Sequence, residues 1–231
     1  MREIVLDTET TGLDPFSGHR LVEIGCIELI NRIPSGQTFH CYLNPERGMP
    51  EEAFAVHGLS EQFLKDKALF AEIADELLSF LGDAPLVIHN AGFDIAFLNA
   101  EFERVGRPPI GRERMIDTLL IARRKHPGGS NRLDDLCARY AIDNSRRTKH
   151  GALLDAELLA EVYVELIDAR QAQLVLSRAV APMLASGEPI IVRERAVPLE
   201  PRITDEDKAA HREFVAALGE NAIWRDYLRA D

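Results

Sequence analysis

The sequence has few cysteines and no long apolar run. Its three cysteines, Cys26, Cys41 and Cys137, have no partner at the spacing of a metal-binding or redox motif, so we expect buried free thiols in a reducing compartment. No apolar run approaches the roughly 20 residues that a membrane-spanning helix needs. Residues 1–7 lead directly into a strand pattern, without a charged and then apolar leader. These absences predict a cytoplasmic protein that is neither exported nor embedded in a membrane.

Basic residues are also in deficit. The chain has 27 Lys and Arg against 38 Asp and Glu, a formal net charge of −11. Proteins that bind nucleic acid by themselves usually neutralise phosphates with clustered Lys and Arg, and an acidic surface repels phosphates at long range. The charge therefore argues against an autonomous nucleic-acid binder. It permits a subunit whose partner supplies the basic track, or a site in which bound divalent metal ions reverse the local field.

What is present predicts a folded domain. Hydrophobic residues make up 46% of the 231 residues, enough for a substantial core. Residues 33–36 (Ile-Pro-Ser-Gly) indicate a turn in an antiparallel meander, Ser60 can cap a short helix, and Gly82 can end a longer one. We expect strands at 3–8, 21–30, 37–43, 86–88 and 115–116, and helices at 70–81, 95–105, 118–124, 133–140 and 152–169. This order predicts an α/β domain with a mixed sheet.

The character of the chain changes after residue 169. Proline and glycine interrupt residues 182–201, and a late helix is expected at 205–218, with Thr204 as its cap and Gly219 after it. This tail is too short and too interrupted to bury a core of its own, so we expect it to fold against a partner. We therefore divide the chain into a domain at 1–169, a linker at 170–190 and a docking tail at 191–231.

The first chemical signal is a pair of carboxylates, Asp7 and Glu9. Side chains alternate faces along a strand, so these two point the same way and Thr8 points opposite. Adjacent carboxylates repel each other unless a cation lies between them, and Mg²⁺ or Mn²⁺ suits such oxygen ligands. Two solvated carboxylates at a strand end are an equally good interpretation of the pair alone.

Two later segments can supply further acidic groups. Residues 89–94 (His-Asn-Ala-Gly-Phe-Asp) follow the strand at 86–88, and strand ends are where sites collect in α/β sheets. Asp94 would be a third carboxylate there, or an ordinary acid at a helix start. In the segment His150–Asp155, five residues correspond to a rotation of about 140° along a helix. We therefore expect Asp155 in the first turns of the helix at 152–169 and His150 on the loop before it, as a mobile base.

Together these segments resemble the three motifs of the DEDDh (DnaQ-like) 3′→5′ exonuclease family. They occur in the family's order as Asp7-x-Glu9-Thr10-Thr11-Gly12, His89-Asn90-x-x-Phe93-Asp94 and His150-x-x-x-x-Asp155. Each motif alone is weak, whereas the ordered set is specific. Residues 31–32, 39–45, 55–59 and 87–91 are further similar to the proofreading exonucleases of bacterial DNA polymerase III. This likeness covers about three quarters of the chain.

The resemblance implies a fold, a cofactor and an activity. The fold would be RNase H-like, a mixed five-stranded sheet flanked by helices, with a C-terminal partner-binding tail. Asp7, Glu9, Asp94 and Asp155 would hold two divalent metal ions, Mg²⁺ or Mn²⁺, around a scissile phosphate, and neutral His150 would accept a proton from the attacking water. The reaction would release nucleoside 5′-monophosphates from a mismatched, single-stranded 3′ end of DNA.

Candidates for holding the terminal nucleotide lie in and between these motifs. Hydroxyls and a flexible turn at 10–12 can lie close to a nucleotide, and aromatic or imidazole rings can stack on a base. For Phe54 and Phe93, packing in the core is an equally good interpretation. The predicted substrate residues are Thr10, Thr11, Gly12, Leu13, Phe54, His57, Asn90 and Phe93. Arg146, Arg147 and Lys149 can contact phosphates, although a solvated basic loop is the commoner meaning of such a run.

The tail carries two weaker resemblances. Residues 171–176, with Gln171, Leu174 and Leu176, are similar to the peptide by which polymerase subunits bind the sliding clamp. Residues 203–224 resemble the tail that docks on the catalytic (alpha) subunit of DNA polymerase III, and Trp224 is a suitable interface anchor. The implied partners are that subunit, the clamp and a small theta-like subunit. An RNA exonuclease of the same fold and a non-catalytic bridging subunit remain the alternatives.

Overall fold

A mixed five-stranded sheet forms the centre of the first of two compact units, Met1–Gln173 and Leu174–Asp231. The computed structural model describes residues 1–147, 149–169 and 203–219. The strand order is β3-β2-β1-β4-β5. The strands are β1 (Arg2–Thr10), β2 (Leu21–Ile30), β3 (Ile33–Tyr42), β4 (Leu86–Ile88) and β5 (Met115–Asp117). The predicted mixed sheet is therefore confirmed.

The direction of the strands brings three carboxyl ends to one edge of the sheet. β1, β4 and β5 run parallel, whereas β2 and β3 run antiparallel to their neighbours. β1 therefore ends beside the ends of β4 and β5, with residues 7–10, 89–94 and Asp117 at the same edge. The carboxyl edge of parallel strands is the usual place for a site in an α/β fold.

The predicted turn of the first hairpin is wrong by two residues. The two turn residues are Asn31 and Arg32, which adopt positive φ angles of 51° and 69°, and Ile30 pairs directly with Ile33. Two consecutive residues with positive φ match the twist of the flanking strands. Pro34 and Gly36 lie inside β3 instead, and Pro34 pairs with Leu29 before the register shifts. β3 is an edge strand, where proline and an irregularity in pairing are tolerated.

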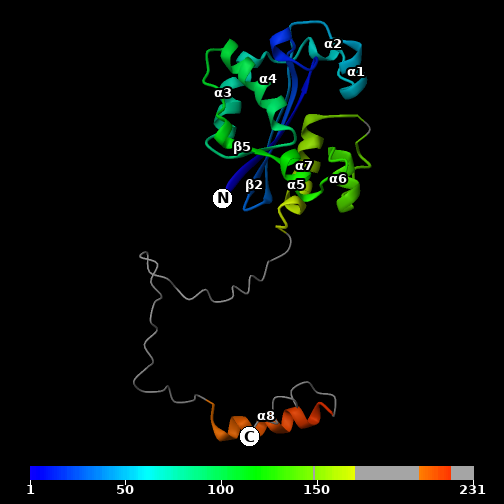
Figure 1. The fold of residues 1–231 in the computed structure, drawn as a ribbon. Coiled ribbons are helices and arrows are strands. Elements are labelled where there is room, and N and C mark those ends of the chain that lie inside the picture. The colour runs from blue at the N-terminus through cyan, green and yellow to red at the C-terminus, as the bar shows by residue number, and fades with distance from the viewer. Residues whose placement is uncertain (148, 170–202, 220–231) are drawn as a thin grey trace, which may run out of the picture. The chain divides into compact units, whose positions relative to one another are not determined.

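The helices occupy both faces of the sheet, with α3 and α4 on one face and α5, α6 and α7 on the other (Figure 1). Most of the expected helices are confirmed; α4 begins earlier than expected and α7 ends earlier. The segment 51–57, for which no helix was expected, forms α1. The bounds are α1 (Glu51–His57), α2 (Glu61–Leu64), α3 (Phe70–Leu81), α4 (Ala91–Arg104), α5 (Thr118–Lys125), α6 (Leu133–Tyr140) and α7 (Ala152–Leu166), with short 3-10 turns at Pro15–Ser17 and Arg112–Arg114.

Alternate residues of β1 belong to two hydrophobic cores. Ile4 and Leu6 pack with α3 and α4 in one core, whereas Val5 packs with residues of α6 and α7 in the other. Both faces of the sheet are thus buried along β1, and its side chains alternate between them as far as Glu9, where the pairing with β2 shifts register. This alternation decides which helix each functional side chain of β1 faces.

The second unit contains the expected late helix. α8 runs from Asp205 to Ala217, and the Thr204 hydroxyl accepts a hydrogen bond from the backbone nitrogen of Asp207 at 3.1 Å. Gln171, Leu174 and Leu176, like residue Trp224, lie outside the described residues, so the clamp-binding and docking peptides remain predictions. The boundaries at 169/170 and 190/191 also stay predictions. Within the described ranges, no helix is long and apolar enough to cross a membrane.

Candidate active site

Asp7 and Glu9 lie at the end of β1 on the face that α7 covers. They continue the series of Glu3 and Val5, and Glu3 accepts a hydrogen bond from the Tyr163 hydroxyl of α7 at 2.8 Å. Thr8 points to the opposite face, where its hydroxyl donates to Asp94 Oδ1 at 2.7 Å. The alternation expected from the sequence therefore joins the acids of β1 to α7 and Thr8 to α4.

Gly25 allows α7 to approach the sheet at this point. It is paired with Asp7 across β1 and β2, and a Cβ atom added to it would lie 2.3 Å from the backbone nitrogen of Leu153. No side chain fits at such a distance, so the start of α7 lies directly on the backbone of β2. Asp155, in the first turn of α7, is thereby held beside the acids of β1.

Asp94 lies in the first turn of α4, and the residue that caps this helix has a left-handed backbone conformation. Asn90 precedes the helix with a φ of 68° and a ψ of 50°, a left-handed conformation that asparagine adopts more readily than most residues. Its backbone nitrogen donates to Asp117 Oδ1 at 3.3 Å, which links the end of β4 to the end of β5. Asp94 itself is 3% exposed, and helix-start acids are stabilised by the helix dipole.

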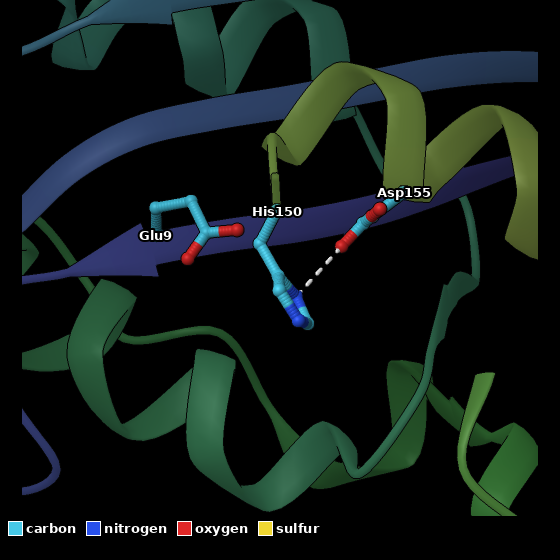
Figure 2. A group of neighbouring side chains, drawn as sticks. All are labelled: Glu9, His150 and Asp155. Atoms are coloured by element: carbon cyan, nitrogen blue, oxygen red, sulfur yellow. Dashed lines mark ion pairs between the residues drawn. The ribbon is translucent and has the colours of Figure 1, made fainter. Parts of the chain in front are cut away.

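These side chains line one cavity of about 770 Å³. Asp7, Glu9, Asp94, Asp155 and His150 all contribute to its wall. Glu9, His150 and Asp155 each place one possible ligand atom within 4.8 Å of the other two (Figure 2). His150 Nδ1 lies 3.3 Å from Asp155 Oδ2, and the imidazole is 48% exposed. The structure thus brings the five predicted chemical groups together.

Three of the four acids are held in a way that opposes their ionisation. Burial raises the pKa of Glu9 to about 8, with further contributions from Asp155 and Glu23. Burial likewise raises the pKa of Asp94 to about 7, although the hydrogen bond from Thr8 acts in the opposite direction. Burial and the charge of Asp94 raise the pKa of Asp7 well above its usual value. A cluster of this kind becomes favourable when a cation is placed within it.

Asp155 differs because Arg147 pairs with it. Arg147 Nε lies 2.5 Å from Asp155 Oδ1, and Arg147 Nη2 lies 2.7 Å from Asp155 Oδ2. Burial alone would raise the pKa of Asp155, but its close contacts with His150 and Arg147 outweigh burial and lower that pKa. Arg147 Nη2 also donates to His150 Nδ1 at 2.7 Å. One guanidinium therefore contacts both the acid and the imidazole.

A second cavity, of about 500 Å³, lies next to the first. Thr8, Glu9 and Phe93 line both cavities, so the two meet at the acids of β1. The second has an apolar wall that includes Leu13 and Val56. The size and lining of the second cavity suit a base and sugar. The first cavity is lined mainly by charged and polar side chains instead.

Comparison with known proteins agrees with this geometry. The family model described as RNase_T, exonuclease, matches residues 4–163. The chain belongs to this exonuclease family. It is 50% identical over 224 residues to the DNA polymerase III subunit epsilon of Rickettsia conorii, covering 94% of this chain and 96% of that one. It is 44% identical over 237 residues to the subunit of the same name from Escherichia coli, covering 97% of both.

The fold is shared with solved exonuclease structures. Exonuclease X in complex with 5′ overhanging duplex DNA superposes with a TM-score of 0.55 and 23% identity, covering 72% of this chain and 91% of that one. At this identity the likeness concerns the fold alone. The mixed five-stranded sheet with helices on both faces is the RNase H-like exonuclease fold, as the resemblance implied.

Most of the predicted substrate residues of this exonuclease line one of the two cavities. The second cavity is lined by Thr10, Thr11, Gly12, Leu13, His57 and Phe93, and the first by Asn90 and Phe93. The hydroxyl of Thr10 donates to Gly12 O at 2.6 Å, and that of Thr11 accepts from Arg20 N at 3.0 Å. Both threonine side chains therefore also shape the turn that follows β1.

Phe54 lies apart from the other predicted substrate residues. The face of α1 that lines the second cavity carries Glu52, Ala53, Val56 and His57. At 100° per residue, Phe54 points well away from that face, and it is 45% exposed. Among the described residues that line the two cavities, Phe54 is absent. The aromatic ring that the structure places at the cavities is Phe93.

Several residues at the site carried no clear signal in the sequence. Gly25 is one of 15 glycines, and only the register of the sheet shows why it is needed. Arg147 was considered as a phosphate contact, whereas the structure directs it at Asp155 and His150. Glu52 and Val56 belong to a helix that was not expected. Arg123 and Arg132, which line the first cavity, lie on elements far from any motif.

Proposed function

We propose that this exonuclease removes nucleotides from the single-stranded 3′ end of DNA and proofreads for a replicative polymerase. One observation carries the proposal: four acids and an imidazole from β1, α4, α7 and the loop before it line a single cavity. That cavity adjoins an apolar one large enough for a nucleotide. The near full-length similarity to DNA polymerase III epsilon subunits supports proofreading as the setting, and with it a cytoplasmic location.

The acids suit divalent metal ions, on which the exonuclease family depends. We assign Asp7, Glu9, Asp94 and Asp155 as the groups that would hold two ions, Mg²⁺ or Mn²⁺. The fit rests on their chemistry: all are hard oxygen donors, and three have raised pKa values that a cation would reverse. When bound, such ions supply Lewis-acid chemistry for phosphodiester hydrolysis.

His150 is our candidate for the group that accepts a proton from the attacking water. Its ring is half exposed at the rim of the cavity, on a loop where it can turn. A guanidinium can only donate hydrogen bonds, so His150 Nδ1 is the acceptor in its contact with Arg147. We infer that the imidazole leaves Arg147 before it takes a proton, and that Arg147 then still holds Asp155.

Selection of mismatched ends follows from the need for a single strand. A paired end must fray before its last nucleotide can enter the second cavity. Unpairing costs a few kcal/mol, and less at a mismatch. We assign Thr10, Thr11, Gly12, Leu13, His57 and Phe93 to the terminal nucleotide and Asn90 to the adjoining phosphate region; Phe54 is not assigned to either.

The partners follow from the same proposal. A chain with a net charge of −11 gains a basic DNA track when it works beside a polymerase. We propose the catalytic alpha subunit as the main partner, through the tail at 191–231. The sliding clamp, through Gln171, Leu174 and Leu176, and a small theta-like subunit are further proposed partners.

The decisive experiment is degradation of labelled oligonucleotides by the full-length protein. A 5′-labelled primer on a template, with a matched or mismatched 3′ end, is incubated with Mg²⁺ or with EDTA, and the same sequence is supplied as RNA. We expect a ladder from the 3′ end, faster at the mismatch, releasing 5′-monophosphates and stopped by EDTA. Faster degradation of the RNA oligonucleotide would show that RNA, and not DNA, is the substrate. Absence of cleavage of every substrate, in the presence of the polymerase subunit as well, would leave only a bridging role.

A further inference from the structure

The first cavity has a basic wall as well as an acidic one. Arg123, on α5, and Arg132, at the start of α6, both line it together with Gly128 and Gly129 of the loop between the two helices. Both arginines are exposed. Within the described residues, neither forms an ion pair, whereas Arg20 and Arg147 each pair with carboxylates. Although the chain has an excess of acids, two guanidinium groups at this cavity thus have no ion-pair partner in the part of the chain that the structure describes.

The loop between α5 and α6, which leads to Arg132, is held in place by hydrogen bonds, one of them from His89 at the edge of the site. His89 Nε2, at the end of β4, donates to the Asn131 carbonyl at 2.9 Å. Asn131 Nδ2 donates to the Gly129 carbonyl at 2.9 Å, and Arg139 Nη2 donates to the Ser130 carbonyl at 3.0 Å. Since His89 immediately precedes the segment that leads to Asp94, the loop is fixed relative to the acids. The backbone that leads to Arg132 is therefore fixed beside the cavity, and α5 places Arg123 on the same wall.

The arrangement of the two cavities indicates which part of a bound DNA strand lies against the basic wall. They share Thr8, Glu9 and Phe93, so a strand cut at the acids of β1 must extend into both. The apolar second cavity suits the base and sugar of the departing nucleotide. The remaining strand, on the 5′ side of the cleaved bond, then runs through the first cavity. Its phosphates are the groups that unpaired arginines bind most readily.

We propose that Arg123 and Arg132 form a binding track for the backbone phosphates on the 5′ side of the cleaved bond, with Gly128 and Gly129 leaving room for the strand to lie close to the backbone. This inference rests on the proposed nuclease function. The track gives the chain a local basic surface despite its net charge. The track contacts the part of the strand that stays intact after cleavage. It therefore strengthens the binding of oligonucleotides, whereas the acids and His150 act on the bond that is cleaved.

The test compares two substrates in the full-length protein. A single-stranded deoxyoligonucleotide has phosphates on the 5′ side of the cleaved bond. The p-nitrophenyl ester of thymidine 5′-monophosphate has only the scissile phosphodiester. Arg123→Gln and Arg132→Gln should each raise KM for the oligonucleotide on the order of three-fold or more, and lower the slope of log KM against log salt by roughly 0.7 per arginine removed. Both variants should hydrolyse the ester with unchanged kcat/KM.

Arg124→Gln is the matched control. Arg124 neighbours Arg123 on α5 and is also exposed, so its loss changes the net charge equally, but it does not line the cavity. If Arg124→Gln impairs the oligonucleotide as much as the two cavity variants, the effect is one of general charge and the track is refuted. An equal loss on the ester would also refute it. Failure of the wild-type protein on both substrates would instead overturn the proposed function on which the track depends.

Discussion

Arg147 and Asp155 form a two-pronged ion pair across the candidate active site, with nitrogen–oxygen distances of 2.5 and 2.7 Å. Their side chains are only 7% and 4% exposed. Arg147 is thus the cation that pairs with one member of the four-acid cluster, and its Nη1 also lies 2.6 Å from Asp134 Oδ2. Asp155 is in turn the acid of the four whose pKa is lowered.

Arg147→Gln should therefore destabilise the metal-free protein. Removing one partner of a buried pair leaves the other charge uncompensated, which costs about 3 kcal/mol. Added Mg²⁺ should restore a large part of this loss, because a divalent cation among the acids replaces the missing charge. Urea unfolding in EDTA and in Mg²⁺ measures both effects.

Arg146→Gln is the control for that change. Arg146 pairs with Glu157 at 2.9 Å, but both side chains are exposed, at 71% and 40%. Exposed pairs contribute about 1 kcal/mol or less, so this variant should unfold close to wild type. Equal destabilisation by the two substitutions would contradict a special role for Arg147.

Asp7→Asn should remove activity and leave the fold intact. The amide has nearly the shape of the carboxyl group but no charge with which to hold a cation, so kcat/KM should fall at least 10²-fold, equivalent to about 3 kcal/mol. The unfolding free energy in EDTA should not fall, since burial and Asp94 already oppose ionisation of Asp7. Asp83→Asn, an exposed substitution outside the cavities, should change neither quantity. Near-normal cleavage by Asp7→Asn would remove Asp7 from the metal site.

The raised pKa of Glu9 should make the free energy of unfolding depend on pH. Its pKa in the folded protein is about 8, above the ordinary value near 4.3 for an unfolded chain. The folded state then binds more protons than the unfolded state, so this contribution to stability is complete below about pH 4 and is lost as pH rises to about 8. Metal-free wild type should lose stability relative to Glu9→Gln over this window. Mg²⁺ should reduce the difference.

That comparison isolates Glu9 from other titrating groups. Burial lowers the pKa of His57 and of His89, which adds stability as pH rises through about 6.5, in the opposite direction. Both histidines are present in wild type and in Glu9→Gln, so their contribution cancels in the difference. Melting temperatures from pH 4 to 9 in EDTA give the measurement. A difference that stays constant with pH would show that Glu9 is not the titrating group.

The placement of the acids could be predicted from simple positions in regular elements, whereas their joint role as metal ligands was implied by the resemblance to the exonuclease motifs. Strand alternation placed Asp7 and Glu9 on one face, and the turn per residue of a helix separated His150 from Asp155. Both predictions depend on local geometry that residues 7–9 and 150–155 determine by themselves. The mixed sheet and most helices were predictable for the same reason.

The residues that position those acids could not be predicted, because their roles depend on contacts between distant segments. Gly25 matters only because β2 lies beside Asp7 and beneath the start of α7. Arg147 looked like one member of a solvated basic run, and its direction toward Asp155 depends on the fold of the loop. The hairpin turn was misplaced because Pro34 and Gly36 favour turns locally, whereas pairing of Ile30 with Ile33 set the turn at Asn31 and Arg32.

His150 should determine how activity depends on pH. An imidazole accepts a proton only in its neutral form, so kcat should rise with pH until it reaches a plateau. His150→Gln should lower kcat at pH 8 about 10²-fold or more, the usual contribution of a general base, and should abolish the rise. Because Arg147 donates to His150 Nδ1 at 2.7 Å, we expect the half-exposed ring to leave Arg147 before that nitrogen takes a proton. Single-turnover rates with saturating Mg²⁺ from pH 5.5 to 9 test this. If His150→Gln keeps the wild-type profile, another group takes the proton and the imidazole at the rim has a different role.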